Sequence, residues 1–138
     1  MEMTLRWYGS KFDTVTLEQI RQIPGVTGVI TTLYDTAPGE VWSRERIAAL
    51  KAEVAAAGLH ISGIESVNVH EDIKLGLPGR EQQLENYCKC IENMGKAGIP
   101  ILGYHFMANG VWRTSFSAKG RGGTEFSAYD HAIAEGGY

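Results

Sequence analysis

HISGIESVNVHEDIKLGL, residues 60–77, is the stretch that decides the fold. The β-branched run at 61–64 predicts a strand, and Glu65, Ser66 and His70 follow it before the next helical pattern begins. In parallel α/β folds the carboxyl ends of the strands open onto the crevice where ligands bind. The segment therefore predicts a strand that leads into a candidate site, and a solvated connection is the alternative.

The rest of the chain repeats this alternation of strand and helix. Runs rich in β-branched residues are separated by apolar residues at helical spacing, and no turn of hairpin type lies between the strands. Such an order predicts parallel strands joined by right-handed crossovers. The expected strands cover 3–9, 26–34, 60–66 and 99–107, and the expected helices cover 17–23, 44–57 and 80–97.

Capping residues mark where the helices begin and end. Thr16 and Gln19 fit a capping box, and Ser43 is a side-chain cap for the second helix. Gly58 and Gly98 stand directly after the second and third helices, where a left-handed residue is favoured.

The two cysteines, Cys88 and Cys90, lie within the third expected helix. Side chains two residues apart diverge by about 200° around a helix, so they cannot chelate one ion together. We expect free structural thiols, with Cys88 on the apolar side. The apolar stripe of this helix is expected to consist of Leu84, Tyr87, Ile91 and Met94.

Length and composition fit an α/β protein that is one domain or part of one. The chain has 138 residues, 43% of them hydrophobic, and four strands are half of what a (β/α)₈ barrel contains. Such a barrel needs about 250 residues. Residues 1–138 therefore read as the N-terminal portion of a barrel with helices outside the sheet, and an open four-stranded sheet is the alternative. Residues 108–138 are expected to be mostly loop, above all 115–124, with modest helical character over 127–135.

The charge pattern argues against two classes of partner. The net charge is -3, the pI is about 5.8, and no long basic run occurs, so we expect neither nucleic acid nor an anionic membrane as a partner. The N-terminal residues have no apolar stretch behind a basic start, and no apolar run approaches the roughly 20 residues that span a bilayer. A soluble, cytoplasmic protein is expected.

Four motifs carry a resemblance to a known family. They are RWYG at 6–9, VTLEQIRQIPGVTGV at 15–29, ESVNVHEDIKLG at 65–76 and FMANGVWRTS at 106–115. In this order they resemble the mannonate dehydratases, and the likeness runs over essentially all 138 residues. The resemblance implies a xylose-isomerase-like barrel that removes water from D-mannonate to give 2-keto-3-deoxy-D-gluconate in hexuronate breakdown.

The same resemblance implies a divalent Mn²⁺ or Fe²⁺ as cofactor. The family's cysteine, histidine and aspartate ligands belong to later strands, so none is carried over onto this sequence, and the metal ligands are expected outside this chain. Cys88 and Cys90 do not stand in for the ligand cysteine, because they lie in a helix. The implied partner is a small sugar acid, and a homo-oligomer is left open.

Removing water from an aldonic acid requires a base, an acid and a cation. The proton beside the carboxylate becomes acidic only when the developing enediolate is neutralised. His70 and His105 are candidate acid/base residues, because histidine titrates near neutral pH. The alternatives are a loop histidine that orients its neighbours for His70 and a hydrogen-bonded core histidine for His105.

Five further residues are candidates for holding the substrate. Arg113 suits a bidentate hold on a carboxylate, with a surface arginine as the alternative. Glu65 needs a partner, which we expect to be Lys74, an arginine or a ligand. Glu65, His70, His105 and Arg113 are expected to converge at the C-terminal ends of the strands. The substrate-binding candidates are Trp7, Glu65, Ser66, Trp112 and Arg113, and packing is the alternative for both tryptophans.

Three functions remain open from the sequence. The first is the N-terminal portion of a mannonate dehydratase, inactive by itself because the metal site is incomplete. The second is a non-catalytic truncated barrel that pairs its open edges with a second copy or with a missing half. The third is another sugar isomerase or epimerase of the same superfamily.

Overall fold

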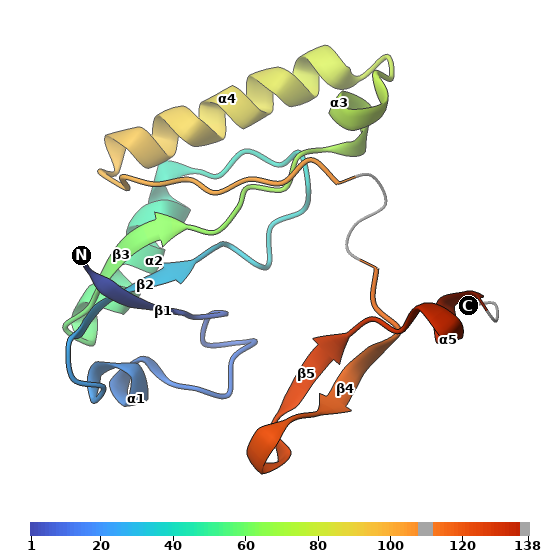
Figure 1. Cartoon of the computed structure of the whole chain (residues 1–138). Helices are drawn as coiled ribbons and strands as arrows, with labels where there is room; N and C mark the ends of the chain where they lie inside the picture. Colours follow the sequence, from blue (N-terminus) through green and yellow to red (C-terminus); the bar gives the residue numbers. More distant parts are fainter. Residues whose placement is uncertain (108–111, 136–138) are drawn as a thin grey trace. The chain divides into compact units, whose positions relative to one another are not determined.

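The computed structural model describes residues 1–107 and 112–135 and divides the chain into two compact units, Met1–Phe106 and Met107–Tyr138. Figure 1 shows the element order along the chain. No described helix is long and apolar enough to cross a bilayer.

A three-stranded parallel sheet forms the centre of the first unit. Its strands are β1 (Met3–Arg6), β2 (Val26–Thr31) and β3 (His60–Ile64), in the order β1-β2-β3. Crossovers through α1 (Leu17–Arg21) and α2 (Arg44–Ala56) join them, as the alternation predicts. Each strand is shorter than expected, because its last residues leave the ladder.

The expected fourth strand over 99–107 is wrong. Only an isolated parallel bridge between Ile64 and Leu102 forms there, with Ile64 N donating to Ile101 O and Gly103 N donating to Ile64 O, both at 2.8 Å. Pro100 has no N–H to add to a longer ladder. The segment thus runs parallel to β3, in the expected direction, but without becoming a strand.

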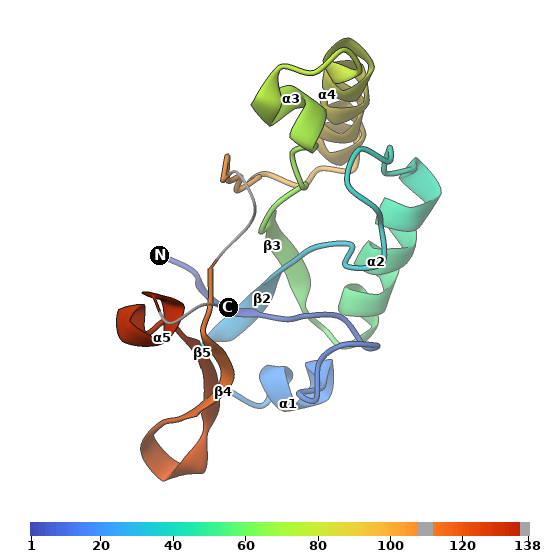
Figure 2. The ribbon, with the colours of Figure 1, turned by 90° about the vertical axis from the view of Figure 1, so that its right-hand side faces the viewer.

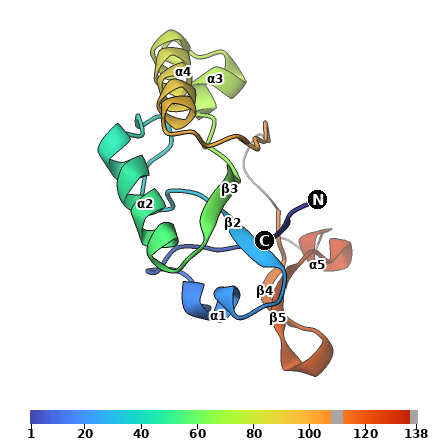
Figure 3. The ribbon, with the colours of Figure 1, turned by 90° about the vertical axis from the view of Figure 1, so that its left-hand side faces the viewer.

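Helices cover one side of this sheet. Figures 2 and 3 show α1, α2 and α4 (Arg80–Lys96) around the sheet on one side, while the opposite face carries no helix of the first unit. The expected helical layer outside a parallel sheet is confirmed for this unit. Apolar residues of the strands, the helices and the loops between them form one core, which consists of Trp7, Leu17, Ile20, Val26, Val29, Trp42, Ile47, Leu50, Val54, Leu59, Ile61, Ile64, Val67, Cys90, Met94 and Ile99.

The predicted caps are confirmed. Thr16 and Gln19 form a reciprocal capping box, and the Ser43 side chain accepts a hydrogen bond from Arg46 N at 3.2 Å. Gly58 and Gly98 follow α2 and α4 with φ of 74° and 72°. Helix boundaries are therefore set by local sequence.

The buried face of α4 differs from the predicted stripe. Leu84 and Ile91 are exposed, whereas Cys90, Asn93 and Met94 are buried. Asn93 donates a hydrogen bond to Trp42 O at 2.8 Å, and Trp42 N donates to the Cys90 sulfur at 3.3 Å, so this face packs on the chain before α2.

Both thiols are free, as expected, but their positions are reversed: Cys88 is exposed and Cys90 is buried. Burial raises the pKa of the Cys90 thiol above its ordinary value, which keeps it protonated and unreactive.

The second unit is a β-hairpin followed by a short helix, so the prediction of a loop over 115–124 is wrong. β4 (Ser115–Lys119) and β5 (Glu125–Ala128) pair antiparallel across a 3₁₀ turn at Arg121–Gly123, and α5 (His131–Glu135) follows. Polar and apolar residues alternate in both strands, as in S-F-S-A-K and E-F-S-A, which is the pattern of a strand with one apolar face.

Two glycines at the end of α4 test the link between backbone angle and stability. A Cβ at Gly95 or at Gly98 meets no atom within 4 Å, but only Gly98 has a left-handed backbone, with φ of 72°. We expect Gly98→Ala to lower the free energy of unfolding by about 1–2 kcal/mol and Gly95→Ala to raise it by about 0.5–1 kcal/mol. Urea denaturation of both variants measures this, and equal effects would contradict it.

Candidate functional site

A network of three side chains joins the C-terminal ends of the three strands. Arg6 ends β1, Tyr34 follows β2 and Glu65 follows β3. The Arg6 Nη2 lies 2.5 Å from Glu65 Oε1, and the Tyr34 hydroxyl donates to Glu65 Oε2 at 3.0 Å. Each oxygen of one carboxylate therefore bonds a different strand end. The network is partly exposed, with 46% of the Arg6 side chain and 33% of the Glu65 side chain accessible.

Aromatic rings extend this network. The Arg6 guanidinium lies 4.2 Å from the centroid of the Tyr8 ring, a cation–π distance, and the Tyr8 and Tyr34 rings lie 5.3 Å apart. The guanidinium is thus held between a carboxylate and an aromatic face. A cation fixed in this way at a strand end suits recognition of a carboxylate or of hydroxyl groups.

The electrostatics of the network favour a protonated tyrosine. Burial and the hydrogen bond to Glu65 raise the pKa of Tyr34 to about 12. Burial opposes the charge of Arg6, but Tyr34 and Glu65 more than offset it and raise the pKa of Arg6 above its ordinary value. At neutral pH Tyr34 is therefore a hydrogen-bond donor and not a base.

The predicted partner class for Glu65 is confirmed, because Glu65 pairs with an arginine. Lys74 instead bonds Glu71 at 2.8 Å. Trp7 lies in the core with 1% of its surface exposed, which is the packing role that the sequence left open. The Ser66 backbone carbonyl accepts a hydrogen bond from Thr32 at 2.6 Å, which anchors the start of the polar loop.

The two candidate histidines differ in their surroundings. The Nδ1 of His70 accepts a hydrogen bond from Asp72 N at 3.2 Å, so His70 caps α3 (Glu71–Leu75), and its Nε2 then carries the proton when the ring is neutral. The Nδ1 of His105 is buried and has no hydrogen-bond partner in the described part of the chain. Such a nitrogen costs about 1–3 kcal/mol unless a partner satisfies it.

Trp112 and Arg113 belong to the second unit. Trp112 is exposed, and the Arg113 guanidinium lies 5.8 Å from the centroid of the Phe116 ring. Their expected contact with substrate stays a prediction, as does the convergence of Arg113 with the residues of the first unit.

Sequence reasoning missed Arg6, Tyr8 and Tyr34 as site residues, although RWYG contains the first two. Successive side chains of a strand point to opposite faces. Because Trp7 packs under the helices, its neighbours Arg6 and Tyr8 are directed away from the core, and this alternation was the signal that could have found them.

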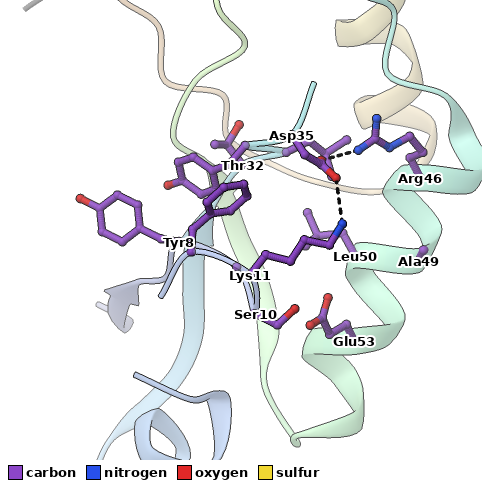
Figure 4. A pocket seen from close by; sticks show the side chains of 13 residues that line it. Tyr8, Ser10, Lys11, Thr32, Asp35, Arg46, Ala49, Leu50 and Glu53 are labelled. Carbon is purple, nitrogen blue, oxygen red and sulfur yellow. Dashed lines mark hydrogen bonds and ion pairs between the residues drawn. The ribbon is translucent and has the colours of Figure 1, made fainter. Parts of the chain in front are cut away.

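A cavity of about 240 Å³ lies beside these strand ends. Figure 4 shows its lining, which comes from the loop after β1, the loop after β2 and one side of α2. Asp35 at its upper end forms ion pairs with Lys11, at 3.5 Å, and with Arg46. These two cations hold the pKa of Asp35 below its ordinary value despite the opposing effect of burial.

Residues 1–107 and 112–135 contain no group of three His, Cys, Asp or Glu side chains arranged to hold a metal ion. The network at the strand ends supplies one carboxylate, already shared between Arg6 and Tyr34. Transition metals in catalytic sites take about three protein ligands. The described residues therefore do not fit a metal centre by themselves.

Comparisons with known proteins agree on one family. The family model of D-mannonate dehydratase (UxuA) matches residues 1–137. A mannonate dehydratase from Thermotoga maritima is 55% identical over 137 residues, which cover 99% of this chain and 38% of that protein, and one from Geobacillus thermodenitrificans is 51% identical over 136 residues, which cover 98% and 37%. The crystal structure of mannonate dehydratase from Streptococcus suis serotype 2 superposes with a TM-score of 0.89 at 44% identity, over 99% of this chain and 39% of that one.

The chain is thus an α/β protein that matches the N-terminal part of a larger enzyme, and its polar residues gather where the parallel strands end. The chain belongs to the D-mannonate dehydratase family. It spans about 38% of the length of the curated relatives it matches.

The raised pKa of Tyr34 gives a test of the network by titration. The difference in absorbance at alkaline pH between the native chain and Tyr34→Phe should have its midpoint near pH 12, the value that burial and Glu65 impose, and Glu65→Gln should lower that midpoint. Because the folded pKa exceeds the ordinary value of 10.0, the neutral hydroxyl stabilises the fold below pH 10, and this contribution is lost as the pH rises through about 12. A midpoint close to 10 would show that Tyr34 is not held as described.

Proposed function

We propose that this chain is the N-terminal portion of a D-mannonate dehydratase, a lyase that converts D-mannonate into 2-keto-3-deoxy-D-gluconate and water in hexuronate breakdown. The match of residues 1–137 to one family model is the observation that carries the proposal. The names of the relatives and the solved structure from Streptococcus suis support it. The proposed setting is the cytoplasm, with a small sugar acid as substrate.

The network at the strand ends is assigned to substrate positioning. Arg6 carries a positive charge beside a carboxylate and an aromatic face, and Tyr34 is held as a donor. A sugar acid brings a carboxylate and several hydroxyl groups, which a fixed guanidinium and hydroxyl can orient. Glu65 keeps both donors in place because it accepts from each of them. Ser66, the residue after Glu65 at the start of the polar loop, is also assigned to substrate positioning.

Proton transfer is assigned to the two histidines. His70 presents its Nε2–H because Asp72 N occupies its Nδ1. His105 has a buried Nδ1 without a partner among the described residues, as expected of a side chain whose partner is a ligand or another part of the enzyme. Arg113 and Trp112 are proposed to hold the carboxylate and the carbon chain from the second unit. Trp7 is buried in the core, where it supports the neighbouring residues Arg6 and Tyr8.

The proposal places the Mn²⁺ or Fe²⁺ of the family on residues beyond those described. When bound, such an ion neutralises the developing enediolate. No step of the reaction is assigned to an ion on the described residues, because these contain no group of three His, Cys, Asp or Glu side chains that could hold one.

One observation favours a second candidate function, a non-catalytic module. Among the described residues, β1 has a neighbouring strand on one side only, and the outer side of β3 forms a single bridge. Unpaired strand edges invite pairing with another chain. In this alternative the chain associates through these edges with a second copy or with the missing part of a barrel, and it has no activity in either case.

A chimaera tests the first proposal against the second. We expect residues 1–138 alone to show no dehydration of D-mannonate with Mn²⁺ present. A catalytic metal ion requires about three protein ligands, and the described residues contain no such group of side chains. Residues 1–137 joined to the part of the Thermotoga maritima relative beyond the match should be active, because the two chains are 55% identical over the matched residues. Formation of the 2-keto-3-deoxy acid is the measurement. An inactive but folded chimaera, or turnover by residues 1–138 alone within about tenfold of the relative, which is about 1.4 kcal/mol, would contradict the proposal.

In the active chimaera, Glu65→Gln should lower kcat/KM by about 10², since a misplaced positioning group typically costs that much. Glu71→Gln is the matched control, because Glu71 pairs with Lys74 alone among the described side chains. Equal activity of the two variants would show that Glu65 has no part in positioning.

A further inference from the structure

The cavity beside the strand ends lies entirely within the first unit and has its own walls. Its lining comes from the loop after β1, the loop after β2 and α2. Its volume is about 240 Å³. Small-ligand sites are concave, with apolar walls and a few polar groups that fix orientation.

The loop that carries one wall is fixed in place. Phe12 N and Asp13 N donate to Gly9 O at 3.1 and 2.9 Å, and the Asp13 carboxylate accepts from Tyr8 N and Val15 N, both at 2.9 Å. This loop leaves the Phe12 residue 59% exposed, with its ring centroid 6.1 Å from that of Tyr34. A wall prepared in this way loses little entropy when a ligand binds.

The polar groups fall into two sets. At one end Asp35 is paired with Arg46 and, more loosely at 3.5 Å, with Lys11, whose side chain runs across the cavity in Figure 4 and is 76% exposed. At the other end Ser10 and Glu53 point toward each other in the same view, and neither side chain forms a hydrogen bond or ion pair with another described residue. An exposed ion pair such as Lys11–Asp35 contributes little to stability because water screens it, so a ligand can displace it readily.

These groups select a class of ligand. Two cations and two carboxylates line the cavity, so their formal charges cancel, and an anion gains no net attraction there. Ser10 and Lys11 can donate hydrogen bonds, and Glu53 and Asp35 can accept them. A chain of carbons that carries neighbouring hydroxyl groups satisfies both sets at once and lays its C–H groups on the aromatic ring.

We propose that this cavity is a binding site for a small neutral polyhydroxy compound, a polyol or monosaccharide, with Phe12 as the apolar wall and Glu53, Ser10 and Lys11 as hydrogen-bonding groups. The site is assigned from the lining residues alone and does not depend on the proposed dehydratase activity.

A titration with two matched ligands tests the proposal. D-mannitol and D-mannonate have the same carbon number, but only the second carries a charge. In ¹H–¹⁵N spectra of residues 1–138, D-mannitol should shift the amide signals of residues 9–12, 33–35 and 49–53 saturably, with a Kd of about 1 mM, the scale of so small a contact. D-mannonate should bind at these residues with no higher affinity.

Variants localise the site. Phe12→Ala and Glu53→Gln should each weaken the binding of D-mannitol by about fivefold to tenfold, which corresponds to one aromatic or hydrogen-bonding contact. Phe106→Ala and Glu85→Gln are the controls, since both residues are exposed and neither lines the cavity. The native spectrum of each variant shows whether it is folded.

Three results would overturn the proposal. They are the absence of saturable shifts at these residues, equal binding by the Phe12→Ala and Phe106→Ala variants, and binding of D-mannonate at least about tenfold tighter than D-mannitol, a difference of about 1.4 kcal/mol, which would assign the cavity to anions.

Discussion

One carboxylate holds the C-terminal ends of the sheet together. Parallel strands have no hairpin between them, so their ends are held by the backbone ladder, with Trp7 N donating to Ile30 O at 2.9 Å and Glu65 N donating to Thr31 O at 2.8 Å, and by side chains that bond across the ends. The Glu65 side chain does so by accepting from Arg6 at the end of β1 and from Tyr34 after β2. Losing this carboxylate would leave a cation and a hydroxyl partly buried without an acceptor. The geometry of the candidate site therefore depends on a contact that also stabilises the sheet.

A second carboxylate, that of Glu2, joins the N-terminal ends of the strands. Glu2 Oε1 lies 2.9 Å from Thr27 Oγ1, 3.0 Å from Ser62 Oγ and 2.7 Å from His60 Nε2. The hydrogen bond from Thr27, aided by Ser62 and His60, lowers the pKa of Glu2 against the opposing effect of burial. Gly28 makes room for this cluster, since a Cβ there would lie 2.0 Å from Ser62 Oγ. In barrels the N-terminal end of the strands serves stability and the C-terminal end serves chemistry, and in this chain a carboxylate network lies at each end of one sheet.

Local signals carried most of what the sequence could predict. The caps at Thr16 and Ser43 depend on neighbours within four residues, and the helices and strands follow from local periodicity in the sequence. The failures are non-local. Which face of α4 is buried depends on Trp42, far away in sequence, and the bridge at Leu102 depends on how far β3 extends. The hairpin was missed for another reason: the glycines of its turn suggested a loop, although each strand alternates polar and apolar residues.

The candidate site could be predicted only in part, because local sequence marks Glu65 but not the residue that pairs with it. Glu65 could be found from the sequence, because a carboxylate at the end of a buried strand needs a partner. Its partner could not, because Arg6 lies one strand beyond the neighbouring β2. Side chains alternate along β1, so burial of Trp7 under the helices turns Arg6 and Tyr8 away from the core. The same three residues thus build the core and the candidate site, so the register of β1 cannot shift by one without exchanging the two.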